Sequence, residues 1–213
     1  MDRRMLARAA LAAAVVGGVS YVAARGLDLP AGLETAWKGS GVGFLALYAA
    51  LRARTVDGRL LTAVMALGAL GDVLLETHGF VVGGAAFLAG HVAAIVLYAR
   101  NRRPGLARGQ ALAAALLVPA TVAAAWTLTG DLGTAVYALG LAAMAAMAWT
   151  SRFPRLAVGL GALMFLVSDL LIFARVAGRA PDDLVVGLAV WGLYFVGQLR
   201  ICTGVDRTLS GGR

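Results

Sequence analysis

The sequence has only one cysteine, Cys202, and one lysine, Lys38, among its 213 residues. A single cysteine excludes a disulfide within the chain and a metal cage built from several cysteines. The chain also has no Walker loop, no HExxH sequence and no GxSxG sequence. Because these elements hold nucleotide phosphates, catalytic zinc and a serine nucleophile, their absence argues against a primary pump, a zincin protease and a serine lipase.

Charged residues are scarce as well: they make up 14% of the chain, against 61% hydrophobic residues. A soluble domain has about 25% charged residues, and this chain has far more apolar sequence than one globular core needs. Several segments reach the roughly 20 apolar residues that cross a bilayer. We therefore predict an all-α, polytopic bundle of membrane helices, with residues 1–213 forming a single transmembrane domain.

The apolar runs predict eight transmembrane spans. Four of the five prolines fall between these runs, where they break no helix, and Pro119 falls inside the fifth run. The abundant glycines, including those of Gly79-x-x-x-Gly83, are expected at positions where helices pack closely. The predicted spans are residues 5–24, 35–51, 60–76, 80–99, 109–129, 132–149, 155–174 and 184–203.

The net charge of +8 is better explained by membrane topology than by nucleic-acid binding, since the arginines lie between hydrophobic runs. With a cytoplasmic N-terminus, only Arg25, Arg175 and Arg179 fall in outer loops. This asymmetry obeys the positive-inside rule, and it favours retention of the first span, which resembles a signal peptide. We expect both termini in the cytoplasm, a bacterial inner (plasma) membrane location and no nucleic-acid partner.

Two of the predicted spans carry an aspartate well inside them, Asp72 in the third and Asp169 in the seventh. Such a charge costs about 2.5–3.5 kcal/mol on insertion scales, so intramembrane acids are usually functional. The two spans run in the same direction, so both residues can lie at a similar depth, somewhat toward the outer face. A buried pair of carboxyls can hold one acid and one base, which makes both candidate catalytic residues. The alternative is a structural hydrogen-bond cluster.

His91 and Glu76 are the other ionisable residues of this region. His91 follows Gly90 in the fourth span, where it could orient a carboxylate, relay protons or bind a metal, or simply pack between helices. We take it as a third candidate catalytic residue. Glu76 lies four residues after Asp72 and so shares its helix face. Its place near the outer end of the span favours a solvated or substrate-contacting residue.

Four further residues are candidates for binding a substrate. Lys38 opens the second span, where its ammonium could meet a lipid phosphate, pair with a buried aspartate or extend to the membrane surface. Tyr194 and Gln198 share a face of the last span, and with Ser168 they could line a polar cavity. Ordinary hydrogen bonding between helices is the alternative for these three.

Several short elements occur in the order and spacing of a known family. They are Gly71-Asp72-x-x-Leu75, then Phe80, Gly84, Phe87 and Gly90-His91, then Ser168-Asp169, then Tyr194 and Gln198, with Lys38 opening the second helix. Over residues 36–202 the chain resembles the YhhN-like lysoplasmalogenase family of eight-helix membrane proteins. Two positions depart from the family pattern: Gly39 stands where we expect proline, and Ala94 where we expect an aromatic residue.

The resemblance implies hydrolysis of the vinyl ether bond of a lysoplasmalogen, which gives a fatty aldehyde and a glycerophospho-alcohol. Asp72 and Asp169 would share the acid and base roles, and Lys38 would bind the head-group phosphate. The expected partners are a lysophospholipid substrate and membrane lipids, with no cofactor and no metal.

Two other functions are compatible with intramembrane acids. A transporter could use them as a proton relay, and a metal-dependent membrane hydrolase could use His91, Asp72 and Asp169 as ligands. A path open in turn to each face would indicate the transporter. Loss of activity after chelation would indicate the metal enzyme.

Overall fold

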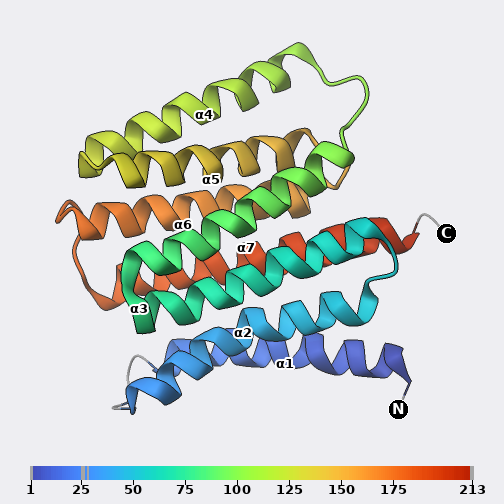
Figure 1. The fold of residues 1–213 in the computed structure, drawn as a ribbon, viewed down its shortest axis with the longest axis horizontal. Coiled ribbons are helices and arrows are strands. Elements are labelled where there is room, and N and C mark those ends of the chain that lie inside the picture. The colour runs from blue at the N-terminus through green and yellow to red at the C-terminus, as the bar shows by residue number, and fades with distance from the viewer. Residues whose placement is uncertain (1, 25–26, 28, 212–213) are drawn as a thin grey trace. The chain divides into compact units, whose positions relative to one another are not determined.

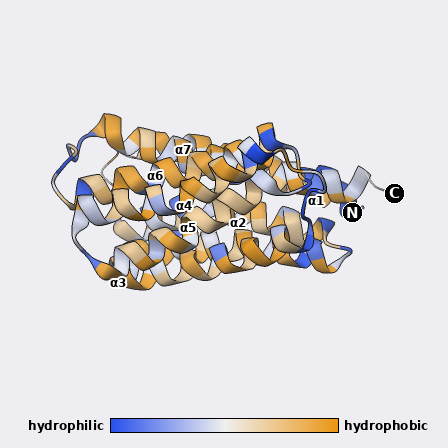
Figure 2. Cartoon of the chain, turned by 90° about the horizontal axis from the view of Figure 1, so that it is seen from above, coloured by the Kyte–Doolittle hydropathy of each residue, from blue (hydrophilic) through white to orange (hydrophobic). Residues whose placement is uncertain are grey.

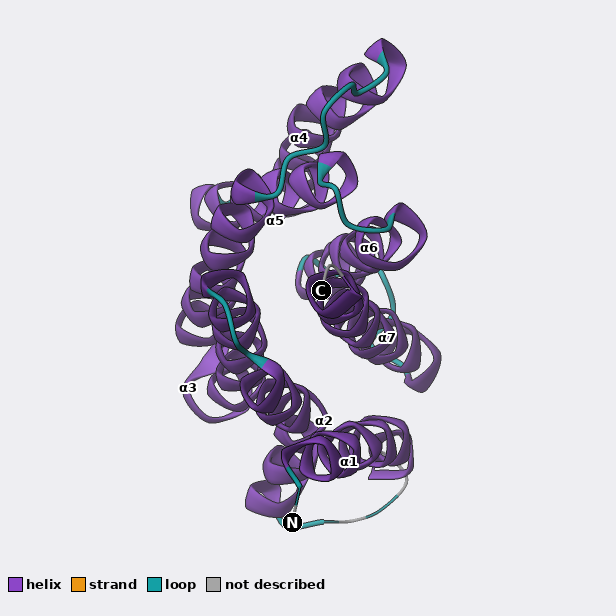
Figure 3. Cartoon of the chain, turned by 90° about the vertical axis from the view of Figure 1, so that its right-hand side faces the viewer, coloured by secondary structure: helices purple, strands orange, loops and turns teal. Residues whose placement is uncertain are grey.

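The computed structural model describes residues 2–24, 27 and 29–211. These residues form helices and connecting loops, with no strand among them (Figure 3). The helices are α1 (Arg3–Ala24), α2 (Ala31–Arg52), α3 (Val56–Arg100), α4 (Arg108–Thr129), α5 (Leu132–Thr150), the π-helix η1 (Arg155–Gly159) that continues into α6 (Leu160–Val176), and α7 (Leu184–Gly211). The predicted all-α fold is therefore confirmed.

Six helical segments of the described chain are long and apolar enough to cross a membrane. They are α1, α3, α4, α5, α6 together with η1, and α7. Hydrophobic residues cover most of the length of these helices, and hydrophilic residues lie mainly near helix ends (Figure 2). Helix α2 is not among the six; it carries Glu34, Lys38 and Arg52 together with four glycines. The six segments indicate a multi-pass membrane protein.

Helix α3 is a hairpin of two antiparallel segments (Figure 1). It reverses at Gly79, whose φ of 83° lies in the region that glycine adopts without a steric penalty. The two segments pack closely, because a Cβ on Gly83 would lie 2.7 Å from the Leu75 backbone and one on Gly71 would lie 2.8 Å from the Phe87 ring. The turn falls between the predicted third and fourth spans.

The interpretation of the Gly79-x-x-x-Gly83 pair as two packing positions is half right. Gly83 packs against the facing segment, but a Cβ on Gly79 would meet nothing within 4 Å. Gly79 is required for its backbone conformation instead. The polar residues Glu76, Thr77 and His78 precede it, and they reach the exposed end of the segment just before the chain reverses.

The chain divides into two compact units. The first comprises Met1–Ala94 with Asp206–Arg213, and the second comprises Ile95–Val205. In the first unit α1 lies along α2 (Figure 1). In the second unit α5 packs against both α4 and α6.

Helix α7 continues to Gly211, eight residues beyond its predicted end at residue 203. Its last turns belong to the first unit, where the buried Asp206 carboxylate accepts hydrogen bonds from Tyr48 at 2.6 Å and from Arg52 at 3.1 Å. Ser210 accepts a further bond from Arg52 at 2.8 Å. The sequence prediction ended the helix where polar residues begin, but these residues bind to α2 and extend the helix past its apolar part.

Two local contacts fix the helix ends of the second unit. Arg152 donates to the Asn101 side chain at 2.7 Å, which ties the end of α3 to the loop after α5. Asp131 caps α5 by accepting the Thr134 backbone N–H at 2.6 Å. That bond, with a second from the Thr134 hydroxyl, holds the pKa of Asp131 below its ordinary value of 3.8.

Candidate functional site

Asp169 is a buried carboxyl in the apolar helix α6. Its side chain is 6% exposed, and the Tyr137 hydroxyl of α5 donates a hydrogen bond of 2.6 Å to its Oδ2 atom. Asp169 lies seven residues before the end of α6 at Val176, a distance of about 10 Å along the helix. A directed donor therefore holds this carboxyl well inside the apolar helix.

Tyr137 was missed by the sequence analysis. It stands in an alanine-rich apolar run, in which a single aromatic residue gives no sign of the direction that it faces. The structure orients it by an edge-to-face contact between its ring and that of Phe173, with ring centres 5.8 Å apart. Phe173 lies four residues after Asp169 and so on the same face of α6. One α6 face therefore positions both ends of the tyrosine side chain.

Ser168 and Tyr194 have structural partners in the second unit. The Ser168 hydroxyl is buried and donates to the Val190 carbonyl of α7 at 2.9 Å. The Tyr194 ring packs edge-to-face on Phe165, with ring centres 5.1 Å apart. Phe165 lies one turn before Asp169, about 6 Å along α6. These contacts align α6 with α7 at the level of Asp169.

Gln198 lies about two helical turns from the level of Asp169. Its neighbour Gly197 packs against Gly161, since a Cβ on either glycine would lie 2.7 Å from the other's carbonyl oxygen. Gly161 precedes Asp169 by eight residues, which is about 12 Å along α6. Gln198 is 2% exposed, and its Oε1 atom has no hydrogen-bond partner among the residues that the structure describes. It is an unsatisfied buried acceptor two turns from the carboxyl.

Asp72 and His91 belong to the first unit and are 2% and 3% exposed. Both lie on the α3 hairpin, and each follows a glycine at the contact between its two segments. Gly71 faces Phe87, and a Cβ on Gly90 would lie 3.4 Å from the Leu67 Cβ.

This placement puts both side chains on the same side of the hairpin. In a helix, each residue is rotated by about 100° from the one before it. Because the two segments are antiparallel, this rotation is clockwise in one and anticlockwise in the other when both are viewed from the same end. The residues that follow the two facing contact positions therefore point to the same side of the hairpin. His91 is level with Leu67, which precedes Asp72 by five residues, or about 8 Å. The structure thus gives Asp72 and His91 a common buried face.

Lys38 and Glu76 form an ion pair in the first unit. The Lys38 Nζ atom lies 2.5 Å from Glu76 Oε1, and the two side chains are 14% and 44% exposed. The backbones approach closely here, because a Cβ on Gly39 would lie 2.9 Å from a Val73 methyl group. Lys38 was expected to meet a lipid phosphate, to pair with a buried aspartate or to extend to the membrane surface. Its partner in the structure is Glu76, one turn beyond Asp72.

Removal of the Tyr137 hydroxyl tests whether Asp169 takes part in a reaction. A hydrogen bond to an ionised group contributes about 1.5–3 kcal/mol, and 1.4 kcal/mol corresponds to a factor of ten. We expect Tyr137→Phe to lower kcat by about tenfold or more with KM little changed, because the ring and its contact with Phe173 are retained. Steady-state kinetics with thermal melting checks this; an unchanged kcat in a folded variant would remove Tyr137 from the site.

The buried carboxyls and the apolar helices define a multi-pass helical membrane protein with acidic groups inside its spans. The family comparison identifies the group more closely: residues 33–205 match the YhhN family. The match covers most of the chain, which therefore belongs to this family. The comparisons with curated proteins and with solved structures gave no match.

A metal centre needs several ligands at one point. Within residues 2–24, 27 and 29–211, no three His, Cys, Asp or Glu side chains gather closely enough to hold an ion.

Proposed function

We propose that this protein is a membrane-embedded hydrolase that cleaves the vinyl ether bond of lysoplasmalogen-type lysophospholipids. Membership of the YhhN family supports this reaction class. In the same proposal, eight segments cross a bacterial inner membrane with both termini in the cytoplasm. The two α3 segments count separately in this topology, and α2 is the remaining span.

The observation that carries the proposal is the environment of Asp169. A carboxyl buried in an apolar helix, with a tyrosine hydroxyl 2.6 Å from one oxygen, is costly to keep in a membrane. Acid-catalysed cleavage of a vinyl ether requires a carboxyl group that can donate a proton. Asp72 is a second buried carboxyl, in α3, and is 2% exposed.

The reaction begins with protonation of the vinyl β-carbon by a carboxylic acid. The adjacent carbon, bonded to oxygen, becomes an oxocarbenium centre. A carboxylate then removes a proton from water as the water oxygen bonds to that centre, and the resulting hemiacetal collapses. The bond between this carbon and the alcohol oxygen breaks, and that oxygen takes the proton that the carboxylate had removed from water. The hemiacetal hydroxyl gives its proton to the carboxylate that began as the acid, which releases the aldehyde and restores both groups. General acid and base groups each contribute about 10²–10⁴-fold, and a nearby negative charge stabilises the cation.

Asp72 and Asp169 carry the acid and base roles in this proposal. His91, on the same side of the hairpin as Asp72, tunes or relays protons. Lys38 binds the head-group phosphate, with Glu76 as its partner when no substrate is bound. Ser168, Tyr194 and Gln198 line the path of the substrate.

The deciding experiment incubates the purified protein with a panel of lysolipids and detects products by mass spectrometry. The panel pairs each vinyl ether with the matching alkyl ether and acyl ester. Release of fatty aldehyde from the vinyl ethers alone is the expected result. No product from any lipid, combined with proton-coupled solute uptake in vesicles, would establish the transporter instead. Aldehyde release that stops after chelation and returns with a divalent metal would establish the metal enzyme.

Loss of the Lys38 charge should weaken substrate binding more than turnover. Lys38→Met keeps the length of the side chain but removes the phosphate partner, and a charge-assisted bond is worth about 1.5–3 kcal/mol. Because 1.4 kcal/mol corresponds to a factor of ten, we expect KM to rise by about tenfold or more, with kcat within about twofold of the native value. Glu76→Gln is the matched control, since it breaks the ion pair and leaves the ammonium available. An equal rise in KM in both variants would show that the ion pair acts only on structure.

A further inference from the structure

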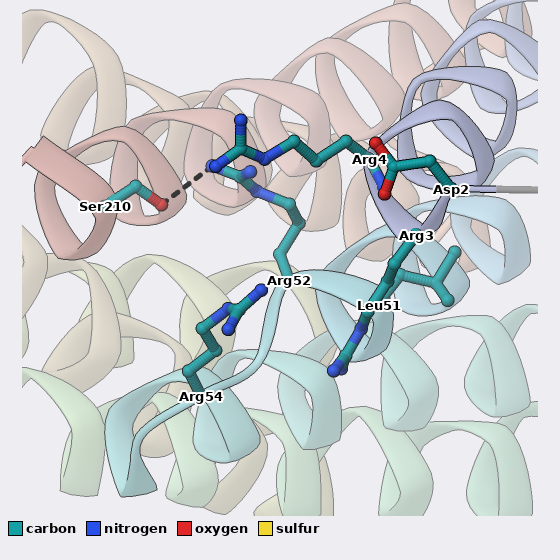
Figure 4. Close-up of a pocket in the computed structure, with 7 residues that line it drawn as sticks. All are labelled: Asp2, Arg3, Arg4, Leu51, Arg52, Arg54 and Ser210. Carbon is teal, nitrogen blue, oxygen red and sulfur yellow. Dashed lines mark hydrogen bonds between the residues drawn. The ribbon is translucent and has the colours of Figure 1, made fainter.

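A pocket of about 420 Å³ opens in the first unit where α1 begins, α2 ends and α7 ends. Four arginines dominate its walls (Figure 4). The lining residues are Asp2, Arg3, Arg4, Leu51, Arg52, Arg54 and Ser210. Lys38 lies 14 residues before Arg52 on α2, about 21 Å along the helix, so this pocket is separate from the site proposed above.

Hydrogen bonds at the helix ends build the pocket. The Asp2 carboxylate accepts the Arg4 backbone N–H at 3.2 Å, and the Arg3 guanidinium donates to the Ala50 carbonyl at 3.2 Å near the end of α2. The start of α1 is thereby held against the end of α2. The arginines of both helices face the same opening for this reason.

The positive charge of the pocket exceeds the negative charge around it. Arg52 is held by the Asp206 carboxylate and by Ser210. Arg4 and Arg54 have no side-chain hydrogen bond or ion pair with any described residue, yet both extend toward Arg52 (Figure 4). Among the described residues, the pocket is lined by four guanidinium groups and one carboxylate, that of Asp2. Asp206 lies outside the lining and pairs with Arg52, so the two carboxylates leave two of the four positive charges unmatched in the described part of the chain.

Membrane topology alone does not explain this arrangement. The positive-inside rule requires arginines in cytoplasmic segments, but it does not require them to converge on one concave surface, where like charges repel. A bound anion would offset the repulsion. Guanidinium groups match phosphate oxygens in a planar, bidentate geometry, and a serine hydroxyl adds a neutral donor. The Arg52 side chain is already fixed in place by α7.

We propose that this pocket binds a phosphate group. The phosphate belongs either to the head group of an anionic lipid in the adjacent leaflet or to a free phosphate in solution. Arg4 and Arg54 supply the unengaged charges, and Arg52 and Ser210 provide the fixed wall.

The test uses the full-length protein in phosphatidylcholine nanodiscs, with melting temperature as the readout. In one arm inorganic phosphate is added; in the other the discs contain a minor fraction of phosphatidic acid. A rise in melting temperature in the lipid arm alone identifies a lipid head group, and a rise with phosphate identifies the free anion. No rise in either arm overturns the proposal.

In the arm that raises the melting temperature, the variant Arg4→Gln/Arg54→Gln should need about tenfold or more of the phosphate or lipid to reach half of the rise. The matched control is Arg59→Gln/Arg108→Gln, which removes the same charge from exposed positions outside the pocket. An equal increase in midpoint concentration in both double variants would show that only the net charge matters, and it would contradict the proposed site. If the pocket pair does not fold, Arg54→Gln alone replaces it, since Arg54 contacts no other described side chain by hydrogen bond or ion pair.

Discussion

Asp169→Asn should lower the rate of aldehyde release by about 10²–10⁴-fold, the usual contribution of a general acid or base. Asparagine keeps the shape of the side chain, and its carbonyl oxygen can still accept the Tyr137 hydroxyl now bonded to Asp169 at 2.6 Å. It cannot give or take a proton in the reaction. The loss should therefore appear in kcat, while the melting temperature stays close to that of the native protein.

Asp72→Asn should have an effect of similar size for the same reason. Because residues that act in one reaction are strongly non-additive, the double variant should be little slower than the more damaged single variant. Asp183→Asn is the control: Asp183 is exposed and accepts the Val186 backbone N–H, a role that asparagine also fills. Full activity in folded Asp72→Asn and Asp169→Asn proteins would show that neither carboxyl performs the chemistry.

The helices of this protein were predictable because their signal is local. Each apolar run is closed by proline, arginine or a short polar segment, and the helices begin and end within a few residues of those places. The exceptions have particular causes. Gly79 looked like a packing glycine but has a positive φ, and α7 continues because Asp206 bonds to Tyr48 and Arg52. Both depend on contacts or dihedral angles that a hydropathy pattern does not encode.

The buried acids were predictable and their partners were not. Asp72, Asp169 and His91 stand out because ionisable groups are rare in apolar runs, and all three are buried. Tyr137 becomes the partner of Asp169, and Glu76 the partner of Lys38, only through the rotation of one helix against another. Those rotations are set by close packing over many residues, such as the contact of Gly161 with Gly197. A single sequence shows which helices have small residues, but not which pair of helices they bring together.

That glycine contact should be the least tolerant point of the second unit. A Cβ on Gly161 would lie 2.7 Å from the Gly197 carbonyl oxygen, 3.1 Å from Ile201 and 3.2 Å from Arg200. The backbone oxygen cannot move aside without shifting α7. Small residues at such crossings allow the backbones of membrane helices to approach closely, and overpacking typically costs about 1–3 kcal/mol.

Gly161→Ala should therefore destabilise the protein by about 1–3 kcal/mol and lengthen the Ser168 to Val190 bond, now 2.9 Å. Activity should fall as well, because Asp169 follows Ser168 on the displaced helix. Gly192→Ala is the matched control: it adds the same methyl group to α7 where a Cβ would meet nothing within 4 Å. It should be neutral or stabilising, since alanine favours a helix over glycine by about 1 kcal/mol. Equal melting temperatures for the two variants would mean that α6 and α7 do not depend on this crossing for their alignment, and the position of Asp169 would then have to be fixed by α5 alone.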